Sequence, residues 1–407
     1  MDRHYAKNIR LYFIYTLLGA LSFSRAIFIV YLASKGFSST QAGMLESTMF
    51  IAMFIMDIPT SIIGDTLGRK WTIFAGCVCL ALYRTGMILC TSFPAFLGIF
   101  ALLGVSSALT SGVDKSLLYE SLKECGREGE YLKMNSRVSA INSCALGMSI
   151  VAGGFMQKIS WDLVNGAGAV TAAAAALCAL LMRETPHEQN HESGQTHKSL
   201  AATAAGLKIF CASGEGRKMI WFFVAYALFE AIATPFHIMS QQLWSVTFHM
   251  TPSVMGLLSG GMFVFAAIAC LASNRIGRAF SFKNVALTML ISSSAVMAST
   301  LSGNLYASIF ALTYVYTVPE MFFVFSEDYI QQRIPSRTRA SVLSVWSTTQ
   351  TIFIAISYTL LGWLMDHAGI AKALGIYGVL VIVPVLMFAH YFASQGEPAK
   401  TPPRQPA

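Results

Sequence analysis

Charge is scarce in this sequence, because Asp, Glu, Lys and Arg make up only 12% of its 407 residues. Soluble domains carry about 25% of such residues, so the composition excludes an ordinary water-soluble enzyme. Disorder is excluded too, because 28 Phe, 20 Met and 15 Tyr supply more apolar surface than an unfolded chain carries. With 55% hydrophobic residues, the composition is typical of a protein that crosses a membrane many times.

Motifs that carry chemistry are also missing. The eight Cys show no paired spacing of a zinc or redox site, and most lie inside apolar runs, where we interpret them as small buried hydrophobic residues. The sequence contains no Gly-rich phosphate loop, zinc-protease motif or nucleophile elbow. We therefore expect no enzymatic activity, no cofactor and no metal site.

Apolar runs long enough to span a bilayer recur along the chain. A spanning helix needs about 20 largely apolar residues. Twelve segments meet this requirement: 9–34, 40–63, 71–91, 93–120, 134–156, 160–182, 217–246, 252–273, 284–301, 304–329, 338–365 and 371–394. Most connections are short, so consecutive helices must be antiparallel. The predicted fold class is all-α integral membrane, with twelve transmembrane helices in two six-helix bundles.

Lys and Arg are distributed unevenly between the two sides of this predicted bundle. One side holds 22 of the 28 basic residues, whereas the other holds only Lys35, Lys158 and Lys372. The remaining three lie within predicted helices. The positive-inside rule then places both termini in the cytoplasm, and we expect a multi-pass protein of a bacterial inner membrane. Since the net charge of +8 is spread around the cytoplasmic rim, we expect no nucleic-acid partner.

A polar segment, 183–216, divides the chain into six predicted helices on each side. We interpret it as a cytoplasmic linker with a short interfacial helix. The predicted domains are thus an N-terminal bundle, 1–182, and a C-terminal bundle, 217–394. The Pro-rich residues 395–407 are predicted to be a disordered tail.

An internal echo supports a duplicated six-helix unit. Asp65, Gly68 and Arg69 follow the second predicted helix, and Asn274, Gly277 and Arg278 follow the eighth, each 209 residues later. Parallel repeats of this kind are a transporter architecture in which substrate binds between the halves, near the middle of the membrane.

The loop after the second helix carries a family resemblance. Its residues Gly64-Asp65-Thr66-Leu67-Gly68-Arg69-Lys70 resemble the signature of the Major Facilitator Superfamily of secondary transporters. Three further stretches resemble a bacterial drug- and metabolite-exporter-like subgroup: Asp57-Ile58-Pro59-Thr60, Ser111-Gly112-Val113-Asp114 and Arg333-Ile334-Pro335-Ser336. The resemblance has one departure, in the helix-5 motif of proton antiporters, where a Gly-Pro pair precedes a Gly-Gly pair. Here Ser149-Ile150 precede Gly153-Gly154, so the Gly-Pro part of that motif is missing.

The same loop is the predicted cytoplasmic gate, formed by Asp65, Gly68, Arg69 and Lys70. Gly68 permits a tight turn, and Asp65 can face the positive N-terminal end of the eleventh helix near Ser336. We expect this contact to lock the two halves together. The alternative is that Arg69 and Lys70 only fix the topology.

Ionisable side chains at membrane depth are functional candidates, because each costs about 2.5–3.5 kcal/mol at a helix centre on insertion scales. In the first half they are Arg25, Glu46, Asp57, Arg84, Asp114 and Lys115. These acids and bases can pair among themselves, and a structural ion pair between Glu46 and Arg84 is one alternative to a functional role.

The second half places two acids at membrane depth, Glu230 and Glu320, with His237 nearby and no Lys or Arg. Desolvation should favour the neutral acids, which could release a proton when the site opens to water, as proton coupling requires. A protonated Glu that only hydrogen-bonds a neighbouring helix is the alternative. The resemblance implies that helices 1, 4, 7 and 10 line the cavity, and these carry Arg25, Asp114, Glu230 and Glu320.

Together these features predict a secondary active transporter that works by alternating access as a monomer. The predicted partners are a small, partly apolar substrate, protons and the lipid bilayer, and the predicted activity is proton-coupled efflux. Two alternatives stay open: a proton-driven importer, and a membrane receptor or scaffold that does not transport.

Overall fold

The computed structural model describes residues 3–184, 214–334 and 339–394, and within these ranges the secondary structure is entirely helical. The linker residues 185–213 with their predicted interfacial helix, and the predicted tail 395–407, lie outside the described residues. The helices are α1 (Arg3–Ala20), α2 (Phe28–Ser34), α3 (Ser39–Leu67), α4 (Arg69–Leu89), α5 (Phe93–Thr110), α6 (Val113–Glu124), α7 (Tyr131–Met156), α8 (Trp161–Leu181), α10 (Gly214–Gln242), α11 (Pro252–Ala279), α12 (Phe282–Ala298), α13 (Leu305–Arg333), α14 (Arg339–Ala368), α15 (Ile370–Leu380) and α16 (Ile382–Ser394).

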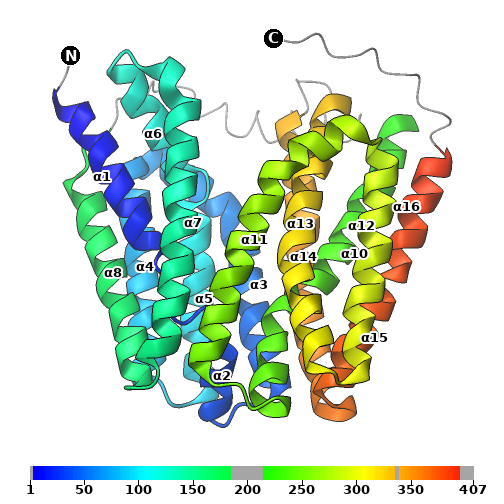
Figure 1. Ribbon diagram of the computed structural model, residues 1–407. Helices are drawn as coiled ribbons and strands as arrows, with labels where there is room; N and C mark the ends of the chain where they lie inside the picture. Colours follow the sequence, from blue (N-terminus) through cyan, green and yellow to red (C-terminus); the bar gives the residue numbers. More distant parts are fainter. Residues whose placement is uncertain (1–2, 185–213, 335–338, 395–407) are drawn as a thin grey trace.

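These helices form two bundles that stand side by side: a first bundle, α1–α8, and a second bundle, α10–α16 (Figure 1). In Figure 1, α1 begins and α16 ends at the same end of the molecule, which we call the terminal end; the opposite end is the far end. The expected all-α fold of twelve spans in two six-helix bundles is confirmed. The first, fourth and twelfth spans each consist of two helices in series: α1 with α2, α5 with α6, and α15 with α16.

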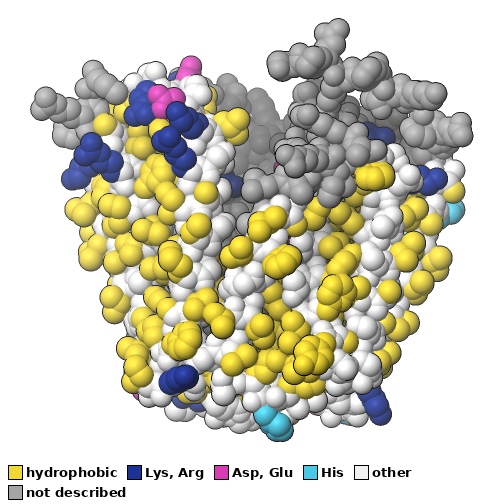
Figure 2. Space-filling view, viewed as in Figure 1, with side chains coloured by type: hydrophobic (Ala, Val, Ile, Leu, Met, Phe, Trp, Pro, Cys, Tyr) yellow, Lys and Arg dark blue, Asp and Glu magenta, His cyan; other side chains and the backbone are white. Residues whose placement is uncertain are grey.

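The outer surface of the bundles suits a bilayer. Nine helical segments in the described part of the chain are long and apolar enough to span a membrane, and a shorter apolar helix covers Pro252–Ala266. Figure 2 shows hydrophobic side chains over the flanks of both bundles, with Lys and Arg gathered mainly at the terminal end of the first bundle. These ten segments correspond to the third to twelfth predicted spans, and their exterior suits a lipid environment.

The first span differs from the continuous helix that its apolar sequence predicts. Helix α1 ends at Ala20 and α2 begins at Phe28, so the backbone from Leu21 to Ile27 is not helical. Apolar residues at this depth would normally continue a helix, because every backbone N–H and C=O needs a partner in a membrane. Here helices α7 and α10 supply hydrogen-bond partners for the backbone around the break.

The two bundles are joined at the far end. The Asp366 carboxylate, near the end of α14, accepts hydrogen bonds from the backbone N–H groups of Ser39 (3.0 Å) and Thr40 (2.8 Å), which are the first residues of α3. A carboxylate at a helix N-terminus satisfies free N–H groups and opposes the positive end of the helix dipole. The Ser253 hydroxyl of α11 likewise donates to the Gly154 carbonyl of α7 (2.9 Å). The side-chain hydrogen bonds between the bundles whose two partners are both described lie at this far end or near the middle.

Candidate functional site

The break between α1 and α2 is held open by the neighbouring helix α7. The Ser149 hydroxyl accepts a hydrogen bond from the Ser22 backbone N–H (2.9 Å). At Gly153 the two backbones come so close that a Cβ atom would lie 1.7 Å from the Phe23 carbonyl oxygen. Residue 153 therefore has to be glycine, and α7 supplies both a hydrogen-bond acceptor and the space for the break.

Arg84 on α4 clamps the break from a second side. Its guanidinium donates hydrogen bonds to the hydroxyls of Ser24 (3.1 Å) and Ser22 (3.0 Å), and the residue is buried at 7% exposure. No ion pair joins Arg84 to Glu46, although both residues are described. The alternative of a structural Glu46–Arg84 ion pair is therefore wrong, because the serine hydroxyls of the break take the guanidinium donors instead.

Gln241 holds the break from the second bundle. Its side-chain amide donates to the Arg25 carbonyl (2.9 Å), and its carbonyl oxygen accepts from the Ile29 backbone N–H (3.3 Å). One amide thus satisfies two backbone groups that a continuous helix would have paired internally. Gln241 lies just before a π-helical turn, Leu243–Thr247, that ends this span of the second bundle. The break is consequently one of the places where the two bundles contact each other.

The break carries Arg25, whose backbone carbonyl is held by Gln241 of the second bundle. Arg25 is exposed, and its guanidinium interacts electrostatically with Glu46 on α3, His237 on α10 and Glu320 on α13. Within residues 3–184, 214–334 and 339–394, no carboxylate forms an ion pair with it. A cation that is neither ion-paired nor fully buried at this depth is available to a ligand.

The two acids of the second bundle differ in their surroundings. Glu230 is half-buried and accepts hydrogen bonds from the hydroxyls of Tyr226 (3.1 Å) and Thr234 (3.2 Å), one turn before and one turn after it on α10. Glu320 is exposed on α13 and interacts electrostatically with both Glu230 and Arg25. Arg25 of the first bundle is thus a basic neighbour of Glu320. The sequence of the second half alone does not reveal it, because that half has no Lys or Arg at membrane depth.

His237 completes the group on the second bundle. Its ring centroid lies 3.6 Å from that of Tyr316, edge to face, and its Nε2 atom is buried with no hydrogen-bond partner. We call the set Arg25, Glu46, Glu230, His237 and Glu320 the central charged group. Its members come from both bundles and from four spans, so only the folded bundle brings them together.

Two other predicted residues lie apart from this group. Asp114 is in the first turn of α6, where its carboxylate accepts a hydrogen bond from the Lys115 backbone N–H (2.7 Å). The same carboxylate interacts electrostatically with Tyr12 and Tyr15 of α1. Asp57 is exposed on α3, in the half nearer the terminal end. Both acids stay candidates for a substrate path rather than members of the central charged group.

The signature loop is anchored within the first bundle. Gly68 has a φ of 93°, a left-handed value that favours glycine, and separates α3 from α4. The Glu184 carboxylate, just after α8, accepts from the backbone N–H groups of Arg69 (2.8 Å) and Lys70 (3.0 Å). The Arg69 side chain forms an ion pair with Glu120 on α6. Neither Glu184 nor Glu120 was predicted from the sequence, because each lies far along the chain from its partner in the signature loop.

The predicted gate contact itself falls outside the described residues. The Asp65 side chain and residues 335–338, which include Ser336 and Arg337, are not described. The contact of Asp65 with the eleventh helix therefore stays a prediction.

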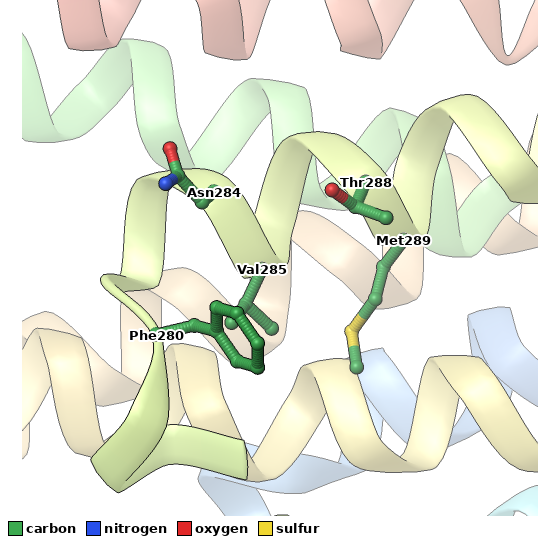
Figure 3. A pocket seen from close by; sticks show the side chains of 5 residues that line it. All are labelled: Phe280, Asn284, Val285, Thr288 and Met289. Atoms are coloured by element: carbon green, nitrogen blue, oxygen red, sulfur yellow. The ribbon is translucent and has the colours of Figure 1, made fainter.

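Two surface cavities lie away from the central charged group. One, of about 230 Å³, is lined by residues at the start of α12 and just before it: Phe280, Asn284, Val285, Thr288 and Met289. Figure 3 shows that none of these side chains is ionisable. The other, of about 310 Å³, lies beside the signature loop and is lined by Arg69, Lys115, Ser116, Tyr119, Glu120 and Tyr131. Among the described residues no cluster of His, Cys, Asp and Glu could hold a metal ion.

Comparison with protein families gives a match over more than half of the chain. The model described as Major Facilitator Superfamily matches residues 11–243 of the 407. No curated protein matches the sequence significantly.

Solved structures resemble the chain over nearly its whole length. The nucleoside transporter NupG, as a mutant, superimposes with a TM-score of 0.77 at 15% identity, covering 95% of this chain and 100% of its own. A bacterial homologue of the human lysosomal transporter Spinster, in an inward-facing and unoccupied conformation, gives 0.73 at 13% identity, covering 98% and 100%. The D-xylose–proton symporter gives 0.66 at 14% identity, covering 95% and 96%. At these identities the likeness concerns the fold alone.

Proposed function

The chain belongs to the Major Facilitator Superfamily and is a multi-pass membrane transporter rather than an enzyme, and we propose that it moves its substrate by proton-coupled alternating access. The proposed substrate is a small, partly apolar molecule, and the proposed direction is efflux in exchange for protons. The proposed setting is a bacterial inner membrane, with a monomeric protein and both termini in the cytoplasm.

The observation that carries this proposal is the position of the central charged group. Arg25 and Glu46 belong to the first bundle, whereas Glu230, His237 and Glu320 belong to the second. Binding between parallel repeats near the membrane midplane is the arrangement that alternating access uses. A substrate that contacts both bundles there would link their relative movement to its own binding.

The hydrogen bonds between the bundles support a cytoplasm-facing state. Those between described side chains gather at the far end and the middle, and the side chains of Asp57, Arg25 and Glu320 are exposed. With cytoplasmic termini, such a state binds substrate and releases protons on the cytoplasmic side, as an exporter requires.

Proton coupling is assigned to Glu230 and Glu320. Neither acid is ion-paired in the described part of the chain, and the hydroxyls of Tyr226 and Thr234 hold Glu230 by hydrogen bonds. In a site closed to water a carboxylate without a paired cation is disfavoured, so protonation stabilises the closed site and opening to water favours release.

The test uses purified protein in liposomes under an imposed pH gradient of either sign. A panel of radiolabelled cationic, neutral, anionic and zwitterionic compounds is offered to the wild type, to Glu230→Gln and Glu320→Gln, and to the surface control Glu128→Gln. We expect gradient-driven accumulation in wild type and in the control but not in the two test variants.

The sign of the gradient separates the alternatives. Efflux by exchange requires that substrate and protons move in opposite directions, and an importer moves them together. Equal transport without a gradient would reject proton coupling, and no transport of any compound would favour a receptor or scaffold.

A further inference from the structure

The exposed charges of the central charged group have opposite signs and come from opposite bundles. Arg25 projects from the break in the first bundle, and Glu320 stands on α13 of the second. They form no ion pair with each other. Gln241 of α10 holds the Arg25 carbonyl (2.9 Å), and His237, one turn earlier on α10, packs on Tyr316, one turn before Glu320, so these contacts bring the two charges to the same level of the molecule. Both side chains are exposed, so each can accept an external partner without first breaking an internal one.

This arrangement discriminates among ligands by their charge. A ligand with only an anionic group would be attracted by Arg25 but would leave Glu320, and the nearby Glu46, facing like charge. A ligand with only a cationic group would be attracted by Glu320 but repelled by Arg25. A ligand that carries both charges can satisfy both bundles at once, and interactions of this kind give specificity by penalising the wrong partner.

The surroundings of the two charges favour an apolar group beside them. The ring of Tyr316 packs edge to face on His237, and Tyr316 lies one turn before Glu320 on α13. The Nε2 atom of His237 is buried without a hydrogen-bond partner, so a ligand reaches it only if a neighbouring side chain moves. Ligand sites of this type combine a mostly apolar wall with a few polar groups that fix orientation.

We propose that the substrate is a zwitterion with an apolar side chain, of the α-amino-acid type, whose carboxylate binds Arg25 and whose ammonium group binds Glu320. This inference rests on the proposed transport function and names its substrate class. The bound zwitterion bridges the two bundles at the level of the break, so the substrate itself completes the contact that Arg25 and Glu320 do not make directly.

The test compares matched probes that differ only in charge. The zwitterions are L-phenylalanine, L-leucine and L-tryptophan; the amines lack the carboxylate, and the acids lack the amine. Transport by the wild type is measured as competition and as direct uptake in liposomes. A charge-assisted hydrogen bond lost in the binding site lowers affinity by about tenfold or more, so at least one zwitterion should exceed both of its analogues by that factor.

Two variants assign each charge to its partner. Arg25→Gln removes the proposed partner of the carboxylate, so the preference for a zwitterion over its amine analogue should fall to about threefold or less. Glu320→Gln removes the proposed partner of the ammonium group, so the preference for a zwitterion over its acid analogue should fall to the same level. Lys158→Gln and Glu128→Gln are surface controls that should keep the wild-type preference. Arg25 makes no side-chain hydrogen bond in the described structure, so Arg25→Gln should fold, which a melting curve checks.

The possible failures are distinguishable. Uptake of amines, acids or neutral compounds in preference to every zwitterion would overturn the substrate class and leave the transport function intact. Preferences unchanged in both variants would overturn the assignment of Arg25 and Glu320. No uptake of any compound in the wild type would overturn the transport function as well.

Discussion

The closed far end depends on the close approach of α3 and α14 at Gly43. A Cβ atom added at this residue would lie 2.3 Å from the Tyr358 carbonyl oxygen and 3.2 Å from the Thr359 Cα atom. Both neighbours are backbone, so they cannot move aside as a flexible side chain would. Gly43→Ala should therefore push the two helices apart by about 1 Å at this point.

The cost of this substitution falls on the closed state alone. Overpacking of this kind costs about 1–3 kcal/mol, and each 1.4 kcal/mol changes an equilibrium constant tenfold. If the bundles separate here during transport, Gly43→Ala should raise the population with a separated far end by about 5-fold to 150-fold.

Hydrogen exchange detected by mass spectrometry reads this population directly. The amides of Ser39 and Thr40 are protected by the Asp366 carboxylate of the other bundle, so they should exchange faster by the same factor. Gly98→Ala is the matched control, because no atom lies within 4 Å of a Cβ atom at this position. Equal exchange in both variants, with both folded, would refute the idea that the α3–α14 contact holds this end closed.

Substitutions at four further residues test contacts that hold the helices in place. Arg84→Met leaves the Ser22 and Ser24 hydroxyls of the helix break without their donors and should destabilise the protein by about 1–3 kcal/mol in detergent. Arg84→Lys should give a stability between those of wild type and Arg84→Met, and an unchanged melting temperature in Arg84→Met would contradict the clamp. At the far end, the hydrogen-exchange rate of the Ser39 amide should be lowest in wild type, higher in Asp366→Asn and highest in Asp366→Ala. Asn keeps one acceptor oxygen but no charge, so it should have an intermediate effect. Identical rates in the three proteins would show that the carboxylate does not hold α3. Glu184→Ala removes the cap of α4 and should cost about 0.5–2 kcal/mol, and Gly68→Ala about 1–2 kcal/mol. Their combined effect should be smaller than the sum, because a Cβ at residue 68 would lie 2.7 Å from the Glu184 carboxyl; simple additivity would contradict that contact.

The spans could be predicted because length and hydropathy are local properties of the chain. The break between α1 and α2 could not, since Leu21, Phe23 and Ile27 are as apolar as the residues of a continuous helix. Its backbone partners are Ser149 and Gln241, which lie more than 100 residues away in the sequence. Only the tertiary arrangement reveals that these side chains replace helical hydrogen bonds.

The candidate site could be predicted residue by residue but not as a group. The cost of burying charge identified Arg25 and Glu320 separately, because each is ionisable at membrane depth. Their proximity depends on how the two bundles face each other, which spacing along the chain does not encode. The same limit applies to Asp114, whose helix belongs to the expected set but whose side chain lies with Tyr12 and Tyr15.

The most direct test of proton-coupled alternating access separates exchange from accumulation in the same liposomes. Substrate counterflow needs the protein to alternate but no net proton movement, whereas accumulation against a gradient needs coupling. Glu230→Gln and Glu320→Gln, each assayed with a compound that the variant still binds, should keep counterflow and lose accumulation driven by a pH gradient. Wild-type accumulation in both variants, or no counterflow in the wild-type protein, would contradict the mechanism.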